Sequence, residues 1–174
     1  ANATLALELA LTVLDMAPGS TVACPALTFP ATATAIARAG HIPYFVDVEL
    51  STWCAAANQI LPLGGDGNRH GENAEAAVMV SAFGAGLSRA QTSGVGAYLV
   101  LDAAPAWGNQ KALEGAITCY SMHATKAFGA GEGGFIVVHD QFEADELRRA
   151  SNFGIEGGIS TGVGTNGKMS EYAA

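Results

Sequence analysis

Short apolar segments alternate with helical segments along most of this 174-residue chain. Strands are predicted at residues 21–24, 42–46, 78–83, 98–101, 117–120 and 135–138, and helices at residues 5–16, 31–39 and 142–151. Strands separated by helices form largely parallel sheets, and the loops at the carboxyl edge of such sheets bind ligands. The pattern therefore predicts an α/β fold whose functional residues follow the strands.

Composition limits the classes of protein to which the chain can belong. With 49% hydrophobic and 14% charged residues, the chain is long enough for one sizeable core and too short for two ordinary domains. Its net charge of −8 argues against a nucleic-acid partner. No apolar run approaches a membrane span, and the N-terminus lacks a signal-peptide pattern. Three cysteines in apolar surroundings, Cys24, Cys54 and Cys119, are read as reduced, buried thiols of a cytoplasmic protein.

Lys126 lies between an expected buried strand and the glycine-rich turn at residues 131–134. Its neighbours Ala124, Ala127 and Phe128 predict an amine that has lost part of its solvation. Desolvation favours the neutral amine, which is the nucleophile that a carbonyl cofactor needs. Taken alone, Lys126 is better read as a loop lysine that pairs with a carboxylate.

Asp102 ends the continuous apolar run at residues 97–102, which is typical of a strand buried on both faces. Pyridoxal phosphate needs a lysine for its Schiff base and an acid that keeps the pyridine nitrogen protonated. Asp102 and Lys126, at the ends of neighbouring predicted strands, fit these two roles. A turn or helix-capping aspartate is the alternative for Asp102 alone.

Seven motifs follow one another from the first residues to the last. They are Asn2-Ala-Thr4, Pro25-Ala-Leu-Thr-Phe-Pro-Ala-Thr-Ala-Thr-Ala-Ile36, Pro43-Tyr-Phe-Val-Asp-Val48, Asp102-Ala-Ala104, Ser121-Met-His-Ala-Thr-Lys126, Gly131-Glu-Gly-Gly134 and Asn166-Gly-Lys-Met-Ser-Glu171. In this order they resemble the DegT/DnrJ/EryC1/StrS family of sugar aminotransferases, which have pyridoxal-phosphate fold type I. The resemblance implies a three-layer α/β fold with a mostly parallel, seven-stranded-type sheet flanked by helices, as in the large domain of aspartate aminotransferase.

The resemblance also implies roles around the cofactor ring. Lys126 would hold pyridoxal phosphate as a Schiff base and move the substrate proton, and Asp102 would pair with the pyridinium nitrogen. Phe29 would stack on one face of the ring, and Ala104 would lie against the other. Without the resemblance, Phe29 reads as an ordinary core aromatic.

A second group of matched residues is expected at the cofactor phosphate. Ala3, Thr4 and Ser121 resemble the phosphate cup of the family, in which helix N-terminal amides bind the dianion. Asn166 matches an asparagine that reaches across a dimer interface to the phosphate of the neighbouring subunit. Thr4 alone would be a helix N-cap, and Asn166 alone a turn residue.

Three positions depart from the family pattern. Pro105 stands where many members carry Gln or His, and Trp107 where a polar residue or His is common. Ala3 replaces the usual glycine of the phosphate turn, which requires a negative φ at this residue.

The family implies amino transfer from an amino acid, with L-glutamate the expected donor, to a keto group of a nucleotide-linked sugar, in a homodimer with shared active sites. Because the motifs extend to both ends, residues 1–174 are expected to be the cofactor-binding large domain, truncated at both ends and without the small C-terminal domain. Alternatives are a non-catalytic fragment that binds the cofactor or a partner, and a dehydratase of the same family. Dehydratase members replace the lysine with histidine, so Lys126 argues against that function.

Other patterns carry weaker signals. A serine hydrolase built from Ser121, His123 and Asp102 would lack the Gly-x-Ser-x-Gly turn. The glycines at residues 84 and 86 resemble a dinucleotide loop without its third glycine or its ribose-binding acid. The polar, glycine-rich residues 64–73 predict a turn or an exposed loop.

Overall fold

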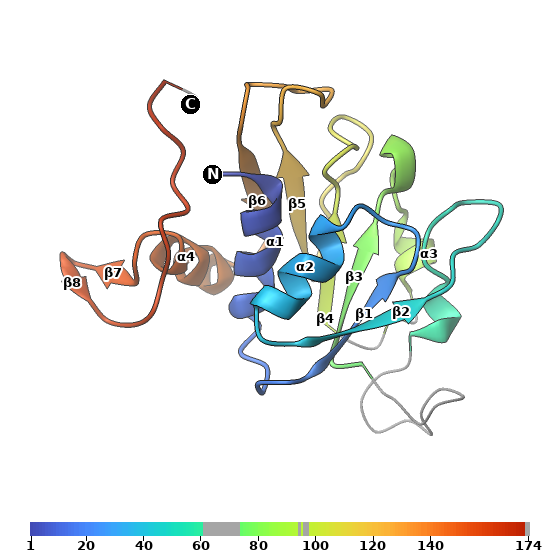
Figure 1. Cartoon of the computed structure of the whole chain (residues 1–174), viewed down its shortest axis with the longest axis horizontal. Coiled ribbons are helices and arrows are strands. Elements are labelled where there is room, and N and C mark those ends of the chain that lie inside the picture. The colour runs from blue at the N-terminus through green and yellow to red at the C-terminus, as the bar shows by residue number, and fades with distance from the viewer. Residues whose placement is uncertain (61–73, 94, 96–97, 173–174) are drawn as a thin grey trace.

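The structure, a computed structural model, describes residues 1–60, 74–93, 95 and 98–172. The loop expected at residues 64–73 lies outside the described residues. The described residues form a six-stranded sheet in the order β2-β1-β3-β4-β5-β6 (Figure 1). Its strands are β1 (Thr21–Pro25), β2 (Ile42–Val46), β3 (Ala76–Val80), β4 (Tyr98–Asp102), β5 (Ala116–Ser121) and β6 (Gly134–Val137). All neighbouring pairs are parallel except β5–β6.

Three longer helices accompany the sheet: α1 (Ala3–Thr12), α2 (Ala31–Arg38) and α4 (Gln141–Ala150). The smaller elements are α3 (Arg89–Thr92), the 3₁₀ turns η1 (Ala57–Gln59) and η2 (Ala82–Gly84), and a hairpin of β7 (Ile155–Glu156) and β8 (Ile159–Ser160). The expected mostly parallel α/β fold is confirmed. Within the described residues its sheet has six strands, where a seven-stranded type was expected. None of the described helices combines the length and the apolar character needed to cross a membrane.

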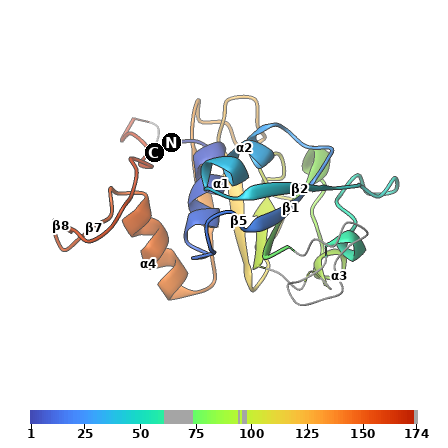
Figure 2. The same cartoon turned by 60° about the horizontal axis from the view of Figure 1, so that its bottom comes forward.

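The core lies on both faces of the sheet. On one face α1 and α2 pack over Val78, Val100 and Cys119. Met79 and Leu101 belong to a second cluster on the opposite face, where only short helices and loops cover the sheet. Figure 2 shows α1 and α2 on one side of the strands and α3 on the other. Neighbouring residues of a strand thus alternate between the two clusters, as the pleat requires.

The same alternation determines where the ends of β4 and β5 point. Val100 faces α1 and α2, so the side chain two residues later, Asp102, lies on the same face at the carboxyl end of β4. Cys119 pairs with Asp102 in the parallel register. Ser121, two residues beyond Cys119, ends β5 on this face as well. The sheet therefore brings the ends of two strands together beneath the helices.

Helix α1 begins earlier and ends earlier than the apolar pattern predicts. The side chain of Asn2 caps it by accepting a hydrogen bond from the backbone N–H of Leu5 at 2.9 Å. The helix ends at Thr12, and Asp15 adopts a left-handed φ of 50°. The leucines up to Leu14 suggested a longer helix because their apolar character continues past the point where the backbone turns.

Strand β3 also differs from its predicted bounds of 78–83. It starts at Ala76 because two alanines, which have low strand propensity, still pair with Tyr98 and Leu99. It ends at Val80, and Phe83 lies in the η2 turn with a left-handed φ of 52°. An aromatic residue after an apolar run looked like a continuing strand, although its backbone belongs to a turn.

The two ends of the described chain lie close together (Figure 1). Residues after the β7–β8 hairpin run back along the end of α4, where Asn152 and Asn166 form an isolated antiparallel bridge. The next residue, Gly167, donates its backbone N–H to the Ser151 carbonyl, and its own carbonyl accepts from the amino group of Ala1 at 2.8 Å. The C-terminal segment therefore lies beside the start of α1.

Candidate active site

Asp102 is a buried carboxylate with a partner on each oxygen. It is 5% exposed at the end of β4. The Thr32 hydroxyl of α2 donates to Oδ2 at 2.9 Å, and the backbone N–H of Ala104 donates to Oδ1 at 3.1 Å. These two bonds fix the carboxylate plane at the carboxyl edge of the sheet.

Burial and the groups around Asp102 shift the pKa of its carboxyl in opposite directions. Burial raises the pKa of the Asp102 carboxyl above its usual range. The Ala104 N–H, the Thr32 hydroxyl and the positive charge of Lys126 act in the opposite direction on this pKa and limit the rise. The charge of Lys126 thus acts on the Asp102 carboxyl, in keeping with the expected position of the two residues after neighbouring strands.

Lys126 lies in the loop between β5 and β6, at residues 122–133. Loop bonds hold its backbone: its N–H donates to the His123 carbonyl, and the Ala124 N–H donates to the Gly131 carbonyl, both at 2.8 Å. Gly129 is required here, because a Cβ at this position would lie 2.8 Å from the Ala124 oxygen. The loop backbone is thus fixed around Lys126.

The expected desolvation of Lys126 by its sequence neighbours is wrong for this chain. Ala124 and Ala127 are exposed, Phe128 is 47% exposed, and Lys126 itself is half-buried. The three neighbours are exposed to solvent and so do not bury the amine. The feature that distinguishes Lys126 is that its charge acts on the buried Asp102 carboxyl.

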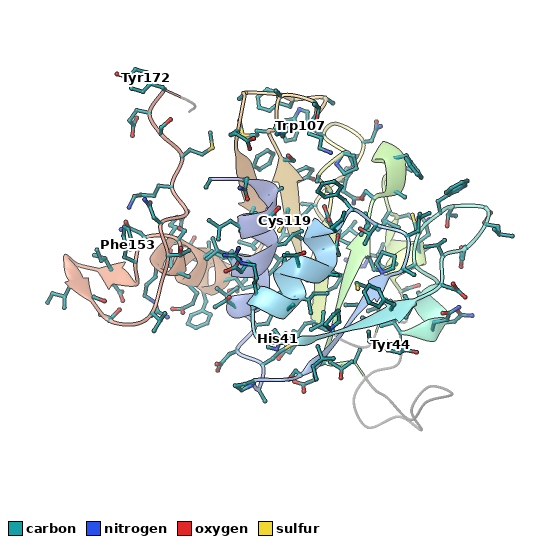
Figure 3. The ribbon with its side chains drawn as sticks, viewed as in Figure 1. His41, Tyr44, Trp107, Cys119, Phe153 and Tyr172 are labelled. Atoms are coloured by element: carbon teal, nitrogen blue, oxygen red, sulfur yellow. The ribbon has the colours of Figure 1, made fainter. Side chains whose placement is uncertain are left out.

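An aromatic cluster supports the Lys126 loop. The ring of Trp107, from the loop after β4, lies 5.2 Å from that of Phe128, 5.6 Å from Tyr120 and 5.1 Å from Phe135. Figure 3 shows Trp107 near the turn that joins β5 and β6. The residue that departs from the family pattern therefore has a packing role: it connects the loop after Asp102 to the loop that carries Lys126.

Ser121 is placed at the N-terminus of α1 by the packing of β6. Ser121 pairs with Gly134, and a Cβ at Gly134 would lie 2.8 Å from the backbone nitrogen of Ala3. The first intrahelical bond of α1 is donated by Ala6, so the N–H groups of Ala3 and Thr4 precede it. The structure thus gathers Ser121 and two helix N-terminal amides, a suitable arrangement for a phosphate.

This turn decides which residue caps α1 and whether Ala3 has the negative φ that its side chain requires. Asn2, and not Thr4, is the N-cap of α1. Ala3 is the first helical residue and is not among the residues with positive φ, so it tolerates the side chain that replaces the usual glycine. Thr4 lies half-buried in the first turn.

Phe29 and Ala104 flank the region around Asp102. Phe29 lies between β1 and α2 and is 76% exposed, so the interpretation as a core aromatic is wrong. Ala104 is half-buried, two residues after Asp102. Their roles on the two faces of a cofactor ring stay predictions.

Asn166 lies apart from this group in the described chain. Its side chain is exposed, and its backbone pairs with Asn152 beyond the end of α4. The adjacent Gly167 contacts Ala1, two residues before Ala3. This segment approaches the phosphate turn, while the role of Asn166 toward a second subunit stays a prediction.

The side-chain contacts do not form a hydrolase triad. The imidazole of His123 contacts Thr125 at 2.8 Å and Glu132 at 3.5 Å. The Ser121 hydroxyl oxygen accepts from the backbone N–H of His123, not from its ring. Asp102 is held by Thr32 and Ala104.

The glycines at residues 84 and 86 serve packing between loops. The Gly84 carbonyl accepts from the side chain of Asn109 at 3.1 Å. A Cβ at Gly86 would lie 2.5 Å from the Asn109 carbonyl oxygen. Close approach of the loop after β4 therefore accounts for the glycines that resembled a dinucleotide loop.

The sequence model of the DegT/DnrJ/EryC1/StrS aminotransferase family matches residues 1–174. The chain belongs to this family. The resemblance read from the seven motifs is thereby confirmed.

Individual members of the family are similar over the whole chain. Protein Rv3402c of Mycobacterium tuberculosis is 31% identical over 192 residues, a match that covers 100% of this chain and 45% of the relative. A solved structure of a putative PLP-dependent aminotransferase from Bacillus cereus is 32% identical with a TM-score of 0.87, covering 99% of this chain and 49% of that one. DesI, solved with its TDP-sugar product, is 32% identical with a TM-score of 0.83, covering 99% and 44%. The chain thus spans about half the length of these relatives.

The residues present fit pyridoxal phosphate, the cofactor of aminotransferases. Three observations support the fit: the buried acid Asp102 at a strand end, the half-buried amine of Lys126 close to it, and the glycine cradle at Gly134 beneath the N-terminus of α1. An acid, an amine and an anion site are the three protein groups that this cofactor needs. They come from β4, the loop after β5, and the contact between α1 and β6.

Thr32 is the functional candidate that sequence reasoning missed. It lies inside a matched motif, but only Phe29 was assigned a role there. The spacing of Thr28 and Thr32, four residues apart at the start of a helix that follows a strand, was the available signal. The spacing alone does not show that the second hydroxyl reaches across to β4.

Proposed function

We propose that this chain is the cofactor-binding part of a pyridoxal-phosphate-dependent aminotransferase that acts on sugars. The observation that carries the proposal is the buried Asp102 carboxylate, which is held on both oxygens and lies within the influence of the Lys126 charge. A buried acid beside a lysine fits a protonated ring nitrogen and a covalent anchor.

Each residue contributes a distinct step. The cofactor, when bound, withdraws electrons from the substrate's reacting carbon. Lys126 Nζ would anchor the cofactor, and after its release it would carry the proton from that carbon to the C4′ carbon of the cofactor. Asp102 keeps the proton on the ring nitrogen, because its carboxylate accepts a hydrogen bond from that nitrogen.

The remaining residues bind and orient. Phe29 and Ala104 confine the two ring faces, and offset contact with an aromatic ring contributes about 0.5–1.5 kcal/mol beyond burial. Ser121 and the amides of Ala3 and Thr4 bind the phosphate dianion, which the positive end of α1 favours.

The substrates are proposed from the family and its members. The amino donor is an amino acid, with L-glutamate our candidate, and the acceptor is a keto group on a nucleotide-linked sugar. The DesI structure, which contains a TDP-sugar product, supports this substrate class. The three cysteines, all free and buried, suit a reducing cytoplasmic setting.

A homodimer with shared sites completes the proposal. Asn166 of one chain would contact the cofactor phosphate held by Ser121 and α1 of its partner. The exposure of Asn166 supports this role, because a side chain facing solvent is available to a second subunit.

Turnover measurements test the proposal. With pyridoxal phosphate and L-glutamate, the chain should release 2-oxoglutarate in the presence of a nucleotide-linked keto sugar. In Asp102→Asn, turnover should fall by several powers of ten, each factor of ten being about 1.4 kcal/mol of barrier. The exposed Asp47→Asn is the matched control. Near-normal turnover in Asp102→Asn would place the acid elsewhere, and a wild-type chain that binds the cofactor without turnover would favour the non-catalytic fragment.

A further inference from the structure

Two threonine hydroxyls form a chain that ends on the Asp102 carboxylate. Thr32, which is fully buried, donates to Asp102 Oδ2 at 2.9 Å. Thr28 Oγ1 lies 2.8 Å from Thr32 Oγ1. Thr28 is half-buried, so the chain runs from the buried acid toward the edge of the site.

Counting donors fixes the direction of this chain. A threonine hydroxyl has one hydrogen to donate. Because Thr32 gives its hydrogen to Asp102, the bond between the two threonines is donated by Thr28 and accepted by Thr32. The Thr32 hydroxyl therefore donates to the Asp102 carboxylate. A hydrogen bond donated to the charged form of an acid favours that form, so this chain favours the ionised carboxylate.

The position of Thr32 is set by the fold. It lies in the first turn of α2, one turn after Thr28, and the turn between them carries the exposed ring of Phe29. A change in the Thr28–Thr32 contact would therefore move both the acid's partner and the aromatic side chain.

The other titratable groups around Asp102 do not replace this contact. Lys126, in the loop after β5, lowers the pKa of Asp102 through its charge. Cys119, on β5 opposite Asp102, has a pKa well above its usual value through burial and the Asp102 charge, so the thiol stays neutral where the carboxyl titrates. When Lys126 is bound to a cofactor, its charge is altered. The hydroxyl chain and the Ala104 N–H then remain to oppose the rise in the Asp102 pKa that burial causes.

We propose that Thr32, supported by Thr28, is a positioning residue that holds the Asp102 carboxylate ionised and aimed at the ring nitrogen. The aim toward that nitrogen rests on the proposed function, whereas the hold on Asp102 does not. Thr32 acts through Asp102 and contacts no reacting atom.

The first test uses the chain without cofactor. The ¹³C resonance of the Asp102 carboxyl, assigned by its loss in Asp102→Asn, is followed against pH. Thr32→Val removes the hydroxyl at nearly constant volume, and its titration midpoint should move to higher pH. Thr28→Val should move the midpoint in the same direction by less. Thr32→Ser keeps the hydroxyl, and Thr34→Val changes an exposed threonine of the same helix, so both should titrate as wild type does.

The second test uses the protein loaded with pyridoxal phosphate. In Thr32→Val, kcat should fall about tenfold while KM for the amino donor changes less, and Thr32→Ser should restore kcat. A midpoint in Thr32→Val equal to that of wild type overturns the hold on Asp102. A shifted midpoint with unchanged kcat overturns the positioning role. If wild type neither binds the cofactor nor turns over, the proposed function fails, and the cofactor-free titration still decides whether Thr32 holds the acid. If Thr32→Val does not fold, Thr28→Val decides: a midpoint at higher pH supports the hold on Asp102, and a midpoint equal to that of wild type overturns it.

Discussion

Ser121 and Gly134 are paired across β5 and β6, and the missing side chain at Gly134 leaves the space that the first residues of α1 occupy. The proposed phosphate site therefore depends on a contact between segments more than a hundred residues apart in sequence. Its two halves, the end of β5 and the start of α1, are in place only when β6 lies directly beneath the turn at Asn2 and Ala3.

Gly134→Ala should weaken cofactor binding by moving this turn. A Cβ would lie 2.8 Å from both the Ala3 nitrogen and the Asn2 carbonyl carbon, and such overpacking costs about 1–3 kcal/mol. We expect a lower melting temperature and a higher Kd for pyridoxal phosphate, measured by absorbance titration. Gly115→Ala is the control: its φ of +77° makes it strained, yet nothing lies within 4 Å of its Cβ, so stability should fall while the Kd is unchanged. Equal Kd values in both variants would contradict the placement of the phosphate.

The sequence predicted the ends of the strands better than the contacts between distant segments. The apolar run before Asp102 and the motif around Lys126 placed the acid and the amine at neighbouring strand ends, because parallel strands share one carboxyl edge. The packing of Gly134 against Ala3 could not be read in this way. It depends on how α1 crosses β6, and no periodicity within either segment records that crossing.

The surroundings of Lys126 show a second limit. Apolar neighbours in sequence suggested a desolvated amine, but in a tight loop consecutive side chains point in different directions, and Ala124 and Ala127 face solvent. Burial of Asp102 was predictable because a strand that is covered on both faces of a sheet buries consecutive residues regardless of the loop that follows. The contact of Thr32 with Asp102 was not predictable, because the two residues lie 70 positions apart in the sequence.

Replacing Asp102 should change how stability depends on pH in the protein without cofactor. Burial raises the pKa of this carboxyl above its unfolded value, so the folded chain holds the proton more tightly than the unfolded chain. The stabilisation from this group is complete below the unfolded pKa and is lost as pH rises through the folded pKa. Asp102→Asn removes this pH-dependent loss of stability. In urea unfolding, the variant should gain free energy of unfolding relative to wild type at neutral pH, and the gain should shrink in acid. A difference that is the same at both pH values would show that Asp102 does not titrate in this way.

Trp107→Ala should loosen the loop that carries Lys126. The ring is 43% exposed and contacts three other rings, so its loss should cost about 2 kcal/mol, less than a fully buried aromatic. Chemical denaturation measures the stability, and the rate of reaction of Lys126 with pyridoxal phosphate reports on the loop. Phe142→Ala, on α4 with 72% of its surface exposed, should alter neither quantity. An unchanged reaction rate in Trp107→Ala would show that the aromatic cluster does not hold the Lys126 loop in place.

Asn166→Ala tests whether the site is shared between two chains. If Asn166 contacts the phosphate of a partner, its loss should raise the Kd for pyridoxal phosphate about tenfold, the effect of one hydrogen bond to a charged group. Cofactor should also promote self-association in wild type, because the ligand binds the dimer better than the monomer. Absorbance titration measures the Kd, and sedimentation velocity with and without cofactor measures self-association. A wild-type monomer that binds the cofactor at full affinity, or unchanged affinity in Asn166→Ala, would rule out the shared site.

The most direct measurement identifies the lysine that bonds to the cofactor. The chain is incubated with pyridoxal phosphate, reduced with borohydride, digested, and the labelled peptide is mapped by mass spectrometry. The chain offers two internal controls: Lys111 is exposed, and Lys168 donates to the Asn152 side chain at 2.6 Å and lies 4.8 Å from the Phe153 ring centre. Of the three lysines, Lys126 is the one whose charge acts on the buried Asp102. We predict a label on Lys126 that is lost in Lys126→Arg; a label on Lys111 or Lys168, or one that persists in Lys126→Arg, would contradict the site.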